Sequence, residues 1–349
     1  ASRGQVEPGV FDTVDEAIQA AKVAQERFED CTLATREKVI ADIRAAMRPR
    51  VQELALKTVE ETGMGRVADK VLKLNLTLDK TPGVEDLVTE CETGDNGMTL
   101  YELSAYGVIG AITPSTNPAE TLICNTIGML AAGNAVFFSV HPGAKHLSRL
   151  LVSELNQIIS KSIGIENLIV TLSEPSIESA QEMMVHPDVS LLVVTGGPGV
   201  VKQALQSGKK VIGAGAGNPP AFVDETADIK KAAQDIVLGA SLDNNILCIA
   251  EKSVVAMRQI EPQLVQEMVR VGCVLVENQQ DIQRLVDLTV LPNGTPNKKF
   301  VGKNASVILD AARIPYNGDP RLIIIRTPKD HPFAIIEMLM PILPVVTVD

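Results

Sequence analysis

Residues 107–118 read GVIGAITPSTNP, a short apolar strand followed by a turn and by the start of a helix. Further apolar strands follow at AVFFSV (135–140), LIVTL (168–172), LLVVTGG (191–197) and KVIGAG (210–215), and helices are predicted over 119–131, 145–160 and 198–207. Such alternation predicts a doubly wound parallel sheet with helices on both faces, an α/β fold. Ligands of such sheets bind beyond the carboxyl ends of the strands.

A second series of strands and helices begins at 221–223, includes a strand at 253–257 and runs to Asp349. The two series are separated by the Gly-Asn-Pro-Pro stretch at 217–220. The sequence therefore predicts two α/β domains, residues 1–218 and residues 219–349.

Two helices and a hairpin are predicted ahead of residue 107. A capping box at 13–16 starts the first helix, and an apolar face at helical spacing predicts the second over 36–61, ending at Gly63. The Gly-Asp-Asn-Gly stretch at 94–97 predicts the turn of a hairpin within about 88–105. We expect this hairpin to complete its sheet on a partner subunit.

The composition excludes several classes of protein. Hydrophobic residues make up 45% of the 349 residues, while the net charge of -11 argues against nucleic-acid and anionic-membrane partners. No apolar run is long enough to span a bilayer. The five cysteines form no CxxC pair, so the sequence predicts neither a disulfide framework nor a metal site, and a reducing compartment fits best.

Two turns have the pattern of anion-binding loops. Residues 113–118 and 195–199 each follow a strand and open a helix, where main-chain N–H groups can bind the pyrophosphate of a dinucleotide. A plain strand-to-helix turn is the alternative, and the third glycine of an ordinary Rossmann fingerprint is absent. The alternate glycines at 213–217 indicate either a close approach to a ligand or backbone, or a tight bend between domains.

Cys248 lies in LDNNILCIAEK, residues 242–252, between a polar turn and an apolar strand. It is either a small buried hydrophobe or a nucleophile. Asn117, at a helix start, is an uncharged double hydrogen-bond donor suited to an oxyanion beside a thiolate. The sequence offers no obvious histidine partner, which disfavours a Cys-His protease, and His331 is interpreted as a turn or cap residue.

Five blocks of the sequence together carry a resemblance to a known family. They are TPSTNP at 113–118, TGGPG at 195–199, GAGAGNPP at 213–220, LDNNILCIAEK at 242–252 and HPFAIIEMLMPILPVV at 331–346. With these blocks, the chain from about Gly9 to Asp349 resembles the CoA-acylating branch of the aldehyde dehydrogenases, of the type used for propanediol and ethanolamine in bacterial microcompartments. The resemblance implies a doubly wound cofactor domain that binds NAD and CoA, a catalytic domain that carries the thiol, and an oligomerisation hairpin.

The resemblance also implies roles for individual residues. Cys248 is the nucleophile that adds to the aldehyde, and Asn117 with the main-chain amide of Cys248 holds the resulting oxyanion. Glu337 holds the nicotinamide ribose; the alternative is a carboxylate at a strand edge. The other residues expected at the cofactor are Thr113, Pro114, Ser115, Ser139, His141, Pro142, Thr195, Gly196, Gly197, Ala214, Gly215 and Leu339.

Two positions depart from the hydrolytic aldehyde dehydrogenases. Ala214 stands where they have the glutamate that activates water, and loss of such a base slows attack by water roughly 10² to 10⁴-fold. The resemblance therefore implies that a thioester on Cys248 survives until CoA takes the acyl group of propionaldehyde or acetaldehyde. Ser139 stands where they have a lysine, which leaves the choice between NAD and NADP open.

The family also sets expectations about assembly. It continues beyond the point where this sequence ends and carries an encapsulation helix ahead of its start, so we expect a C-terminally truncated chain. The resemblance implies a homo-oligomer, a dimer or tetramer, in the cytoplasm within a microcompartment, with shell or cargo proteins as further partners. Two alternatives are a hydrolytic enzyme that releases free acid and a non-catalytic assembly subunit.

Overall fold

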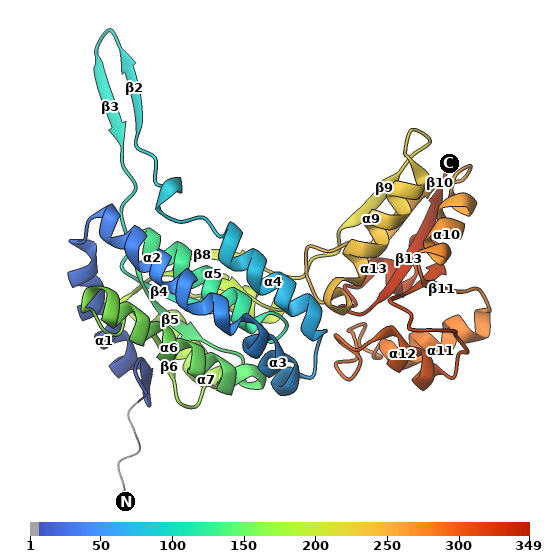
Figure 1. Cartoon of the computed structure of the whole chain (residues 1–349), viewed down its shortest axis with the longest axis horizontal. Helices are drawn as coiled ribbons and strands as arrows, with labels where there is room; N and C mark the ends of the chain where they lie inside the picture. The colour runs from blue at the N-terminus through green and yellow to red at the C-terminus, as the bar shows by residue number, and fades with distance from the viewer. Residues whose placement is uncertain (1–6) are drawn as a thin grey trace, which may run out of the picture. The chain divides into compact units, whose positions relative to one another are not determined.

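The computed structural model describes residues 7–349, which form two compact units (Figure 1). The first unit contains the described residues up to Thr62 and Val71–Gly215, and the second contains Gly63–Lys70 and Ala216–Asp349. Compared with the predicted division into 1–218 and 219–349, residues 63–70 and 216–218 belong to the second unit and not to the first.

The first unit is built on a six-stranded sheet with the order β1-β6-β5-β4-β7-β8. Every neighbouring pair is parallel, as the alternation of strands and helices predicts. The chain runs outward from β4 through β5 to β6 and then crosses to β7 on the other side of β4, so β4 lies at the topological switch point. The strands are β1 (Val10–Phe11), β4 (Val108–Ile112), β5 (Ala135–Ser139), β6 (Ile169–Leu172), β7 (Val189–Thr195) and β8 (Lys210–Ala214).

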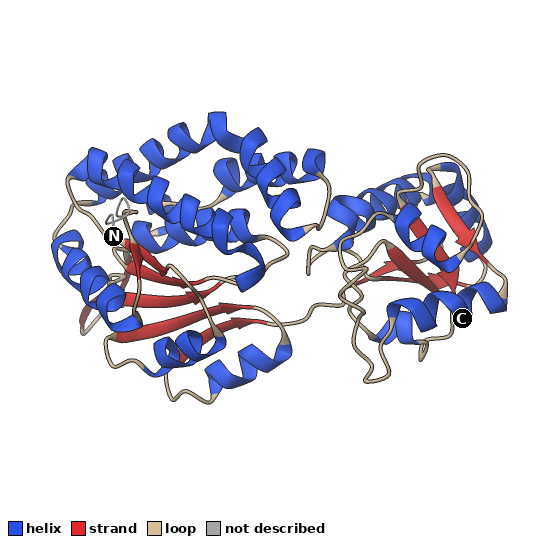
Figure 2. Ribbon diagram, turned by 90° about the horizontal axis from the view of Figure 1, so that it is seen from below, coloured by secondary structure: helices blue, strands red, loops and turns tan. Residues whose placement is uncertain are grey.

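Helices cover both faces of this sheet (Figure 2). Helices α5 and α6 contact β5 and β6 and are covered by α2 and α3, whereas α1 and α7 pack on the sheet beside one another. Because α5 lies between the sheet and other helices, most of its residues are buried. These helices are α1 (Val14–Glu29), α2 (Leu33–Met47), α3 (Val51–Thr62), α5 (Pro118–Ala131), α6 (Lys145–Ile163), α7 (Ile177–Val185) and α8 (Pro198–Leu205).

The second predicted helix, over 36–61, is wrong as a single element. The structure has two helices there, α2 and α3, separated by the 3-10 turn η1 (Arg48–Arg50). Helix α2 begins earlier than predicted, because the side chain of Thr32 caps it by accepting a hydrogen bond from the main-chain N–H of Thr35. Pro49 explains the break, since proline has no N–H to donate in a helix interior. A further helix, α4 (Val67–Lys80), begins among the residues of the second unit and ends among those of the first.

A hairpin stands away from the body of the first unit (Figure 1). Its strands β2 (Glu90–Gly94) and β3 (Gly97–Tyr101) pair in antiparallel register, with Gly94 opposite Gly97. All ten residues of the two strands are exposed. The sequence thus predicts the turn correctly, and the hairpin makes no sheet with other described residues of its own chain. The short 3-10 turn η2 (Val84–Asp86) precedes it.

The second unit is a five-stranded parallel sheet with the order β11-β12-β13-β10-β9. One core cluster joins α9 and α10 to the sheet, and another joins α11, α12 and α13 to it. Among residues 7–349, no helix combines the length and apolar character needed to cross a bilayer. The elements are β9 (Pro220–Val223), α9 (Ile229–Ser241), η4 (Leu242–Asn245), β10 (Ser253–Met257), α10 (Glu261–Arg270), β11 (Cys273–Val276), α11 (Gln279–Thr289), α12 (Ala305–Ala312), β12 (Leu322–Arg326), α13 (Pro332–Ile335) and β13 (Ile342–Val348).

Candidate functional site

Cys248 lies on the connection between η4 and β10 and is half-buried. Three consecutive residues ahead of it, Asp243, Asn244 and Asn245, have left-handed backbone conformations with φ of 50°, 57° and 62°. Asn and Asp adopt this conformation more readily than other non-glycine residues, which explains the polar turn in the sequence. All three are fully buried, so their side chains need partners inside the protein.

The partners of Asp243 come from residues 63–70. Its carboxylate accepts hydrogen bonds from the main-chain N–H of Arg66 at 2.8 Å and from Nζ of Lys70 at 2.9 Å, while its own N–H donates to Asp69. Gly65, with φ of +81°, allows this approach: a Cβ there would lie 2.1 Å from Oδ1 of Asp243. Residues 63–70 therefore hold in place the first residue of the turn that leads to Cys248.

Lys252 fixes the other side of the turn. Its Nζ donates to the carbonyl oxygens of Leu247 at 2.5 Å and Asn245 at 3.1 Å, and also to Oδ1 of Asn245. Burial lowers the pKa of Lys252 to about 8, although the negative charges of Glu337 and Cys248 oppose the shift. These bonds tie Asn245 to Leu247, the residue just before Cys248, and so hold the end of the turn in place.

The glycine-rich stretch meets the same turn. A Cβ on Gly217 would lie 2.4 Å from the carbonyl oxygen of Cys248, so only glycine allows the two backbones to approach. The main-chain N–H of Gly217 also donates a hydrogen bond to Glu337. Burial raises the pKa of Glu337 above its ordinary value, although this bond and the charge of Lys252 oppose the shift. Leu339, with φ of 52°, accepts a hydrogen bond from the N–H of Gly302. The structure thus brings Glu337 into the surroundings of Cys248.

The other cysteines and His331 are poorer candidates for chemistry. Cys273 is buried among core residues of β11, and burial raises the pKa of its thiol to about 12. His331 caps α13, where its Nδ1 accepts a hydrogen bond from the N–H of Phe333, which confirms the interpretation as a cap residue. Burial lowers the pKa of His331, so it is neutral near pH 7. The described residues form no cluster of three or more metal-ligating side chains.

Asn117 occupies the N-cap of α5 in the first unit, but its side chain does not cap the helix. Its Oδ1 instead accepts a hydrogen bond from Nζ of Lys73, and its Nδ2 donates to Oγ1 of Thr116 at 3.1 Å. The Nζ of Lys73 lies 3.2 Å from Oε1 of Glu120, and both side chains are buried. Sequence reasoning missed Lys73 because it lies on α4, which no motif marked.

The predicted cofactor residues of the first unit gather at one edge of its sheet. The N–H of Thr113, after β4, donates to the carbonyl of Ser139 at the end of β5, and the N–H of Gly196, after β7, donates to that of Ala214 at the end of β8. Pro114 and Ser115 continue the first loop, His141 and Pro142 follow β5, Thr195 ends β7, Gly197 belongs to the loop after it, and Gly215 follows β8. This is the carboxyl edge, on both sides of the switch point at β4.

This edge retains polar groups able to bind a ligand. Thr113 is 2% exposed, yet within residues 7–349 its Oγ1 has no hydrogen-bond partner. Helix α8 begins at Pro198 with no side-chain cap, and a Cβ on Gly197 or Gly199 would meet open space. Main-chain donors and an unsatisfied hydroxyl suit a phosphate-bearing, hydroxyl-rich ligand such as a dinucleotide.

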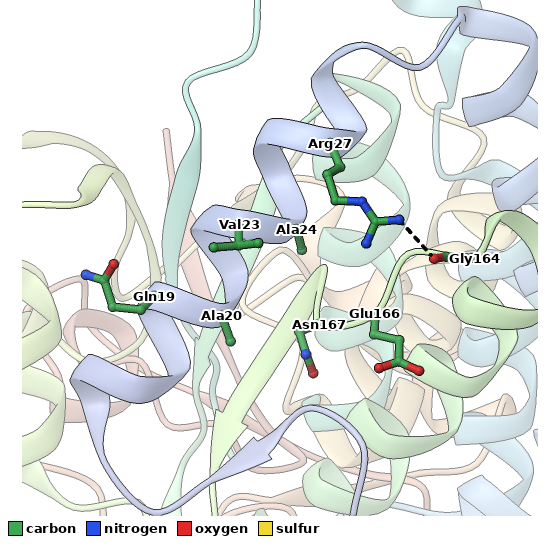
Figure 3. Close-up of a pocket in the computed structure, with 8 residues that line it drawn as sticks. All are labelled: Gln19, Ala20, Val23, Ala24, Arg27, Gly164, Glu166 and Asn167. Atoms are coloured by element: carbon green, nitrogen blue, oxygen red, sulfur yellow. Dashed lines mark hydrogen bonds between the residues drawn. The ribbon is translucent and has the colours of Figure 1, made fainter.

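A cavity of about 460 Å³ lies elsewhere on the first unit, between α1 and the loop that leads into β6 (Figure 3). Arg27 crosses it to donate to the carbonyl of Gly164 at 3.3 Å. Glu166 and Asn167, which line it, precede β6, so the cavity lies at the amino edge of the sheet. Ligands of doubly wound sheets bind at the opposite edge, and this cavity is therefore not the predicted site.

The sequence of the chain matches the Aldehyde dehydrogenase family over residues 4–289. The chain belongs to this family. The aldehyde dehydrogenase is 50% identical over 341 residues to the propanal dehydrogenase (CoA-propanoylating) of Citrobacter freundii, covering 97% of this chain and 74% of that protein. It is 44% identical over 347 residues to the acetaldehyde dehydrogenase (acetylating) EutE of Escherichia coli strain K12, covering 98% and 74%.

Solved structures give the same result. The Rhodopseudomonas palustris propionaldehyde dehydrogenase with bound CoA and an acylated cysteine has a TM-score of 0.95 at 47% identity, covering 99% of this chain and 79% of that one. A propionaldehyde dehydrogenase from the Clostridium phytofermentans fucose utilisation bacterial microcompartment has a TM-score of 0.95 at 46% identity, covering 98% and 79%. The predicted branch of the family and its fold are confirmed.

Proposed function

We propose that this aldehyde dehydrogenase oxidises a short-chain aldehyde with NAD and passes the acyl group from Cys248 to CoA. The observation that carries the proposal is a half-buried cysteine on a turn fixed from both sides, next to a glycine stretch without a carboxylate. The similar enzymes of Citrobacter freundii and Escherichia coli are CoA-propanoylating and acetylating, which supports the acylating reaction.

In this proposal, Cys248 begins the reaction as a thiolate. A bond forms between its sulfur and the carbonyl carbon, and the electron pair of the carbonyl double bond moves to oxygen. Nδ2 of Asn117 and the main-chain N–H of Cys248 donate to this oxyanion. Neither the second proton of Asn117 Nδ2 nor the N–H of Cys248 has a partner among residues 7–349, so both remain available.

The bound cofactors supply what the side chains lack: NAD accepts the hydride and CoA contributes the final thiol. Thr113, Thr195 and Gly196 would line the NAD site, and Glu337 would hold the nicotinamide ribose. When the carbonyl re-forms, Cys248 carries the acyl group as a thioester. The thiolate of the co-substrate CoA would then bond to the acyl carbon as the bond from that carbon to the Cys248 sulfur breaks, which releases acyl-CoA and regenerates the Cys248 thiolate.

The glycine-rich residues 210–217 provide no general base that could activate water against the thioester. Residues 210–217, which read KVIGAGAG, carry no carboxylate, and Ala214 ends β8 where hydrolytic relatives place a glutamate. Without a general base, water attacks a thioester slowly, while a thiolate needs no such help. The acyl group is therefore expected to leave mainly on CoA.

The test is NADH formation from propionaldehyde and NAD with and without CoA. We expect a single burst near one equivalent per Cys248 without CoA, and steady turnover when CoA is added. Equal steady rates in both conditions would favour the hydrolytic alternative. Intact-mass measurement without CoA should find an acyl adduct on Cys248, and Cys248→Ala should lose both the burst and the adduct. An adduct-free protein with no burst would favour the non-catalytic assembly subunit.

The aldehyde dehydrogenase is further proposed to act as a homo-oligomer within a bacterial microcompartment. The exposed hairpin β2–β3, with Met98, Leu100 and Tyr101 at least half exposed, supports pairing with a second copy. The similarity to the enzyme from a fucose utilisation microcompartment supports the location. Light scattering of the chain and of Leu100→Lys tests the first point, since the variant should be shifted toward the monomer.

A further inference from the structure

The amide of Asn117 is oriented by a buried ion pair in the first unit. Lys73, on α4, donates from Nζ to Oδ1 of Asn117. The same Nζ lies 3.2 Å from Oε1 of Glu120, in the first turn of α5, and the side chains of Lys73 and Glu120 are 7% and 8% exposed. Nothing in the reaction proposed above uses either charge directly.

The chemistry of the ammonium group decides which way the Asn117 amide faces. A lysine ammonium has three donors and no acceptor, so it can bond only to the oxygen of the amide. The amide nitrogen must then face away from Lys73, where Oγ1 of Thr116 accepts one of its protons at 3.1 Å. The second proton has no partner among residues 7–349. The orientation of the Asn117 amide is therefore set by the ammonium of Lys73, which can bond only to its oxygen, and does not depend on the shape of the side chain alone.

The position of Asn117 in α5 supports a role outside the helix. Asn at an N-cap ordinarily accepts a hydrogen bond from an N–H of the first turn through its side-chain oxygen. Here the side chain makes no such bond, because Lys73 holds that oxygen. Pro118 at the first helical position also removes one donor that would need a cap. The side-chain amide of Asn117 therefore does not cap α5, and its Nδ2 group is held in an orientation in which it can donate to a ligand.

Glu120 accounts for the burial of the lysine. A buried ammonium is costly unless a nearby charge compensates it. Glu120 lies at ion-pair distance from Lys73, yet its two carboxylate oxygens make no hydrogen bond with other described residues. Its contribution is therefore its negative charge, which compensates the buried ammonium of Lys73 beside Asn117.

We infer that Lys73 is a positioning residue, which directs the Nδ2 donor of Asn117 toward the oxyanion formed on Cys248 and polarises its N–H. This inference rests on the proposed function, in which Asn117 binds that oxyanion. A donor–acceptor chain that begins at a cation strengthens the next donor in line. Loss of Lys73 lets the amide rotate, so the acceptor oxygen can face the oxyanion and repel it.

The experiment is a double-mutant cycle on the NADH burst at saturating propionaldehyde, with Lys73→Met, Asn117→Ala and both together. Loss of one oxyanion donor typically slows catalysis about 10² to 10³-fold, and we expect Asn117→Ala in this range. Lys73→Met should slow the burst about 10 to 100-fold with little change in KM. The double variant should be no slower than Asn117→Ala alone, because Lys73 acts only through Asn117.

Controls separate positioning from structure. Lys80→Met removes an exposed lysine from the end of the same helix and should leave the burst unchanged. Alkylation of Cys248 by iodoacetamide should proceed at the wild-type rate in Lys73→Met, since no oxyanion forms in that reaction. If Lys73→Met does not fold, Lys73→Gln replaces it; its amide nitrogen can still donate to Asn117, so a burst between those of the wild type and Asn117→Ala is expected.

The outcomes distinguish the two claims. A wild-type burst in Lys73→Met or Lys73→Gln, or rate losses that multiply in the double variant, would overturn the positioning role alone. A wild-type burst in Asn117→Ala would overturn the oxyanion role of Asn117 in the proposed function and the positioning role with it. Slower bursts with equal alkylation and no added loss in the double variant support both.

Discussion

The carboxylate of Asp243 accepts a hydrogen bond from Nζ of Lys70 at 2.9 Å, and both side chains are 0% exposed. Asp243 also begins the left-handed turn that leads to Cys248, so a fully buried ion pair anchors the backbone of the nucleophile. Such a pair contributes little net stability relative to apolar residues, but breaking it leaves a buried charge. The role of this ion pair is therefore to fix the position of the turn that leads to Cys248.

The ion pair predicts unequal effects of single and double variants. Lys70→Met leaves the carboxylate of Asp243 buried without its cation and should lower the free energy of unfolding by about 3–5 kcal/mol. Lys70→Met with Asp243→Asn removes both charges and should recover part of that loss. Urea unfolding followed by circular dichroism measures both. A double variant as unstable as the two single losses added together would contradict a coupled pair.

A second prediction concerns the approach of Gly217 to Cys248. Gly217→Ala places a Cβ where the carbonyl oxygen of Cys248 lies at 2.4 Å, so the turn must shift. We expect kcat for CoA-dependent NADH formation to fall at least 10-fold, because small displacements of a nucleophile are costly. Gly128→Ala, on an exposed face of α5 with nothing within 4 Å, is the matched control and should retain activity. Full activity of Gly217→Ala would show that the approach is not needed.

A third prediction is a dependence of stability on pH. Burial lowers the pKa of Lys252 from 10.5 to about 8, so between these values the unfolded chain holds a proton that the folded one has lost. The contribution of Lys252 to the free energy of unfolding must then rise with pH across this window, by roughly 3 kcal/mol in total. Below pH 8 the folded protein carries the full cost of the buried ammonium.

Lys252→Met tests this dependence. The difference in unfolding free energy between wild type and variant should change in favour of the wild type from pH 8 to pH 10.5, as measured by urea titrations at each pH. Alkylation of Cys248 at pH 7 should be slower in the variant, which lacks the ammonium and its bonds to Asn245 and Leu247. A pH-independent difference would mean that Lys252 keeps an ordinary pKa.

A fourth prediction concerns which thiol reacts. Cys273 is buried and its pKa is raised to about 12, whereas Cys248 is half-buried near an ammonium group. Brief treatment with iodoacetamide at pH 7 should label Cys248 and leave Cys273 unmodified, as peptide mass mapping would show. Exposed Cys91 serves as the reference for an ordinary surface thiol. Labelling of Cys273 at the rate of Cys91 would contradict its burial.

The sequence predicts the parallel sheets well, for a physical reason. Strands buried on both faces are continuous apolar runs, and those of β4, β5 and β6 are fully buried in the structure. The loops that follow them lie at one edge because parallel strands share their direction. Residues such as Thr113 and Ser139 are therefore brought to the same edge by topology, where the N–H of Thr113 donates to the carbonyl of Ser139.

The groups that support the site could not be predicted in the same way. Lys70, Lys73 and Lys252 have no distinctive spacing, and lysine is ordinarily a surface residue. Their hydrogen-bond partners are Asp243, Asn117 and Asn245, which are distant in sequence or have a left-handed backbone. Only the paired glycines at 63 and 65 gave a local signal, since Gly65 stands where a side chain would strike Asp243.

The placement of residues 63–70 in the second unit has a consequence for biosynthesis. Lys70 leaves the ribosome 173 residues before its partner Asp243, so this ion pair cannot form until the chain has been made as far as Asp243. Contacts that span so much sequence form late, because a long loop must close first. We expect the turn that leads to Cys248 to become ordered only once this contact has formed, so the thiol gains its final surroundings later than the local helices and strands on either side of it.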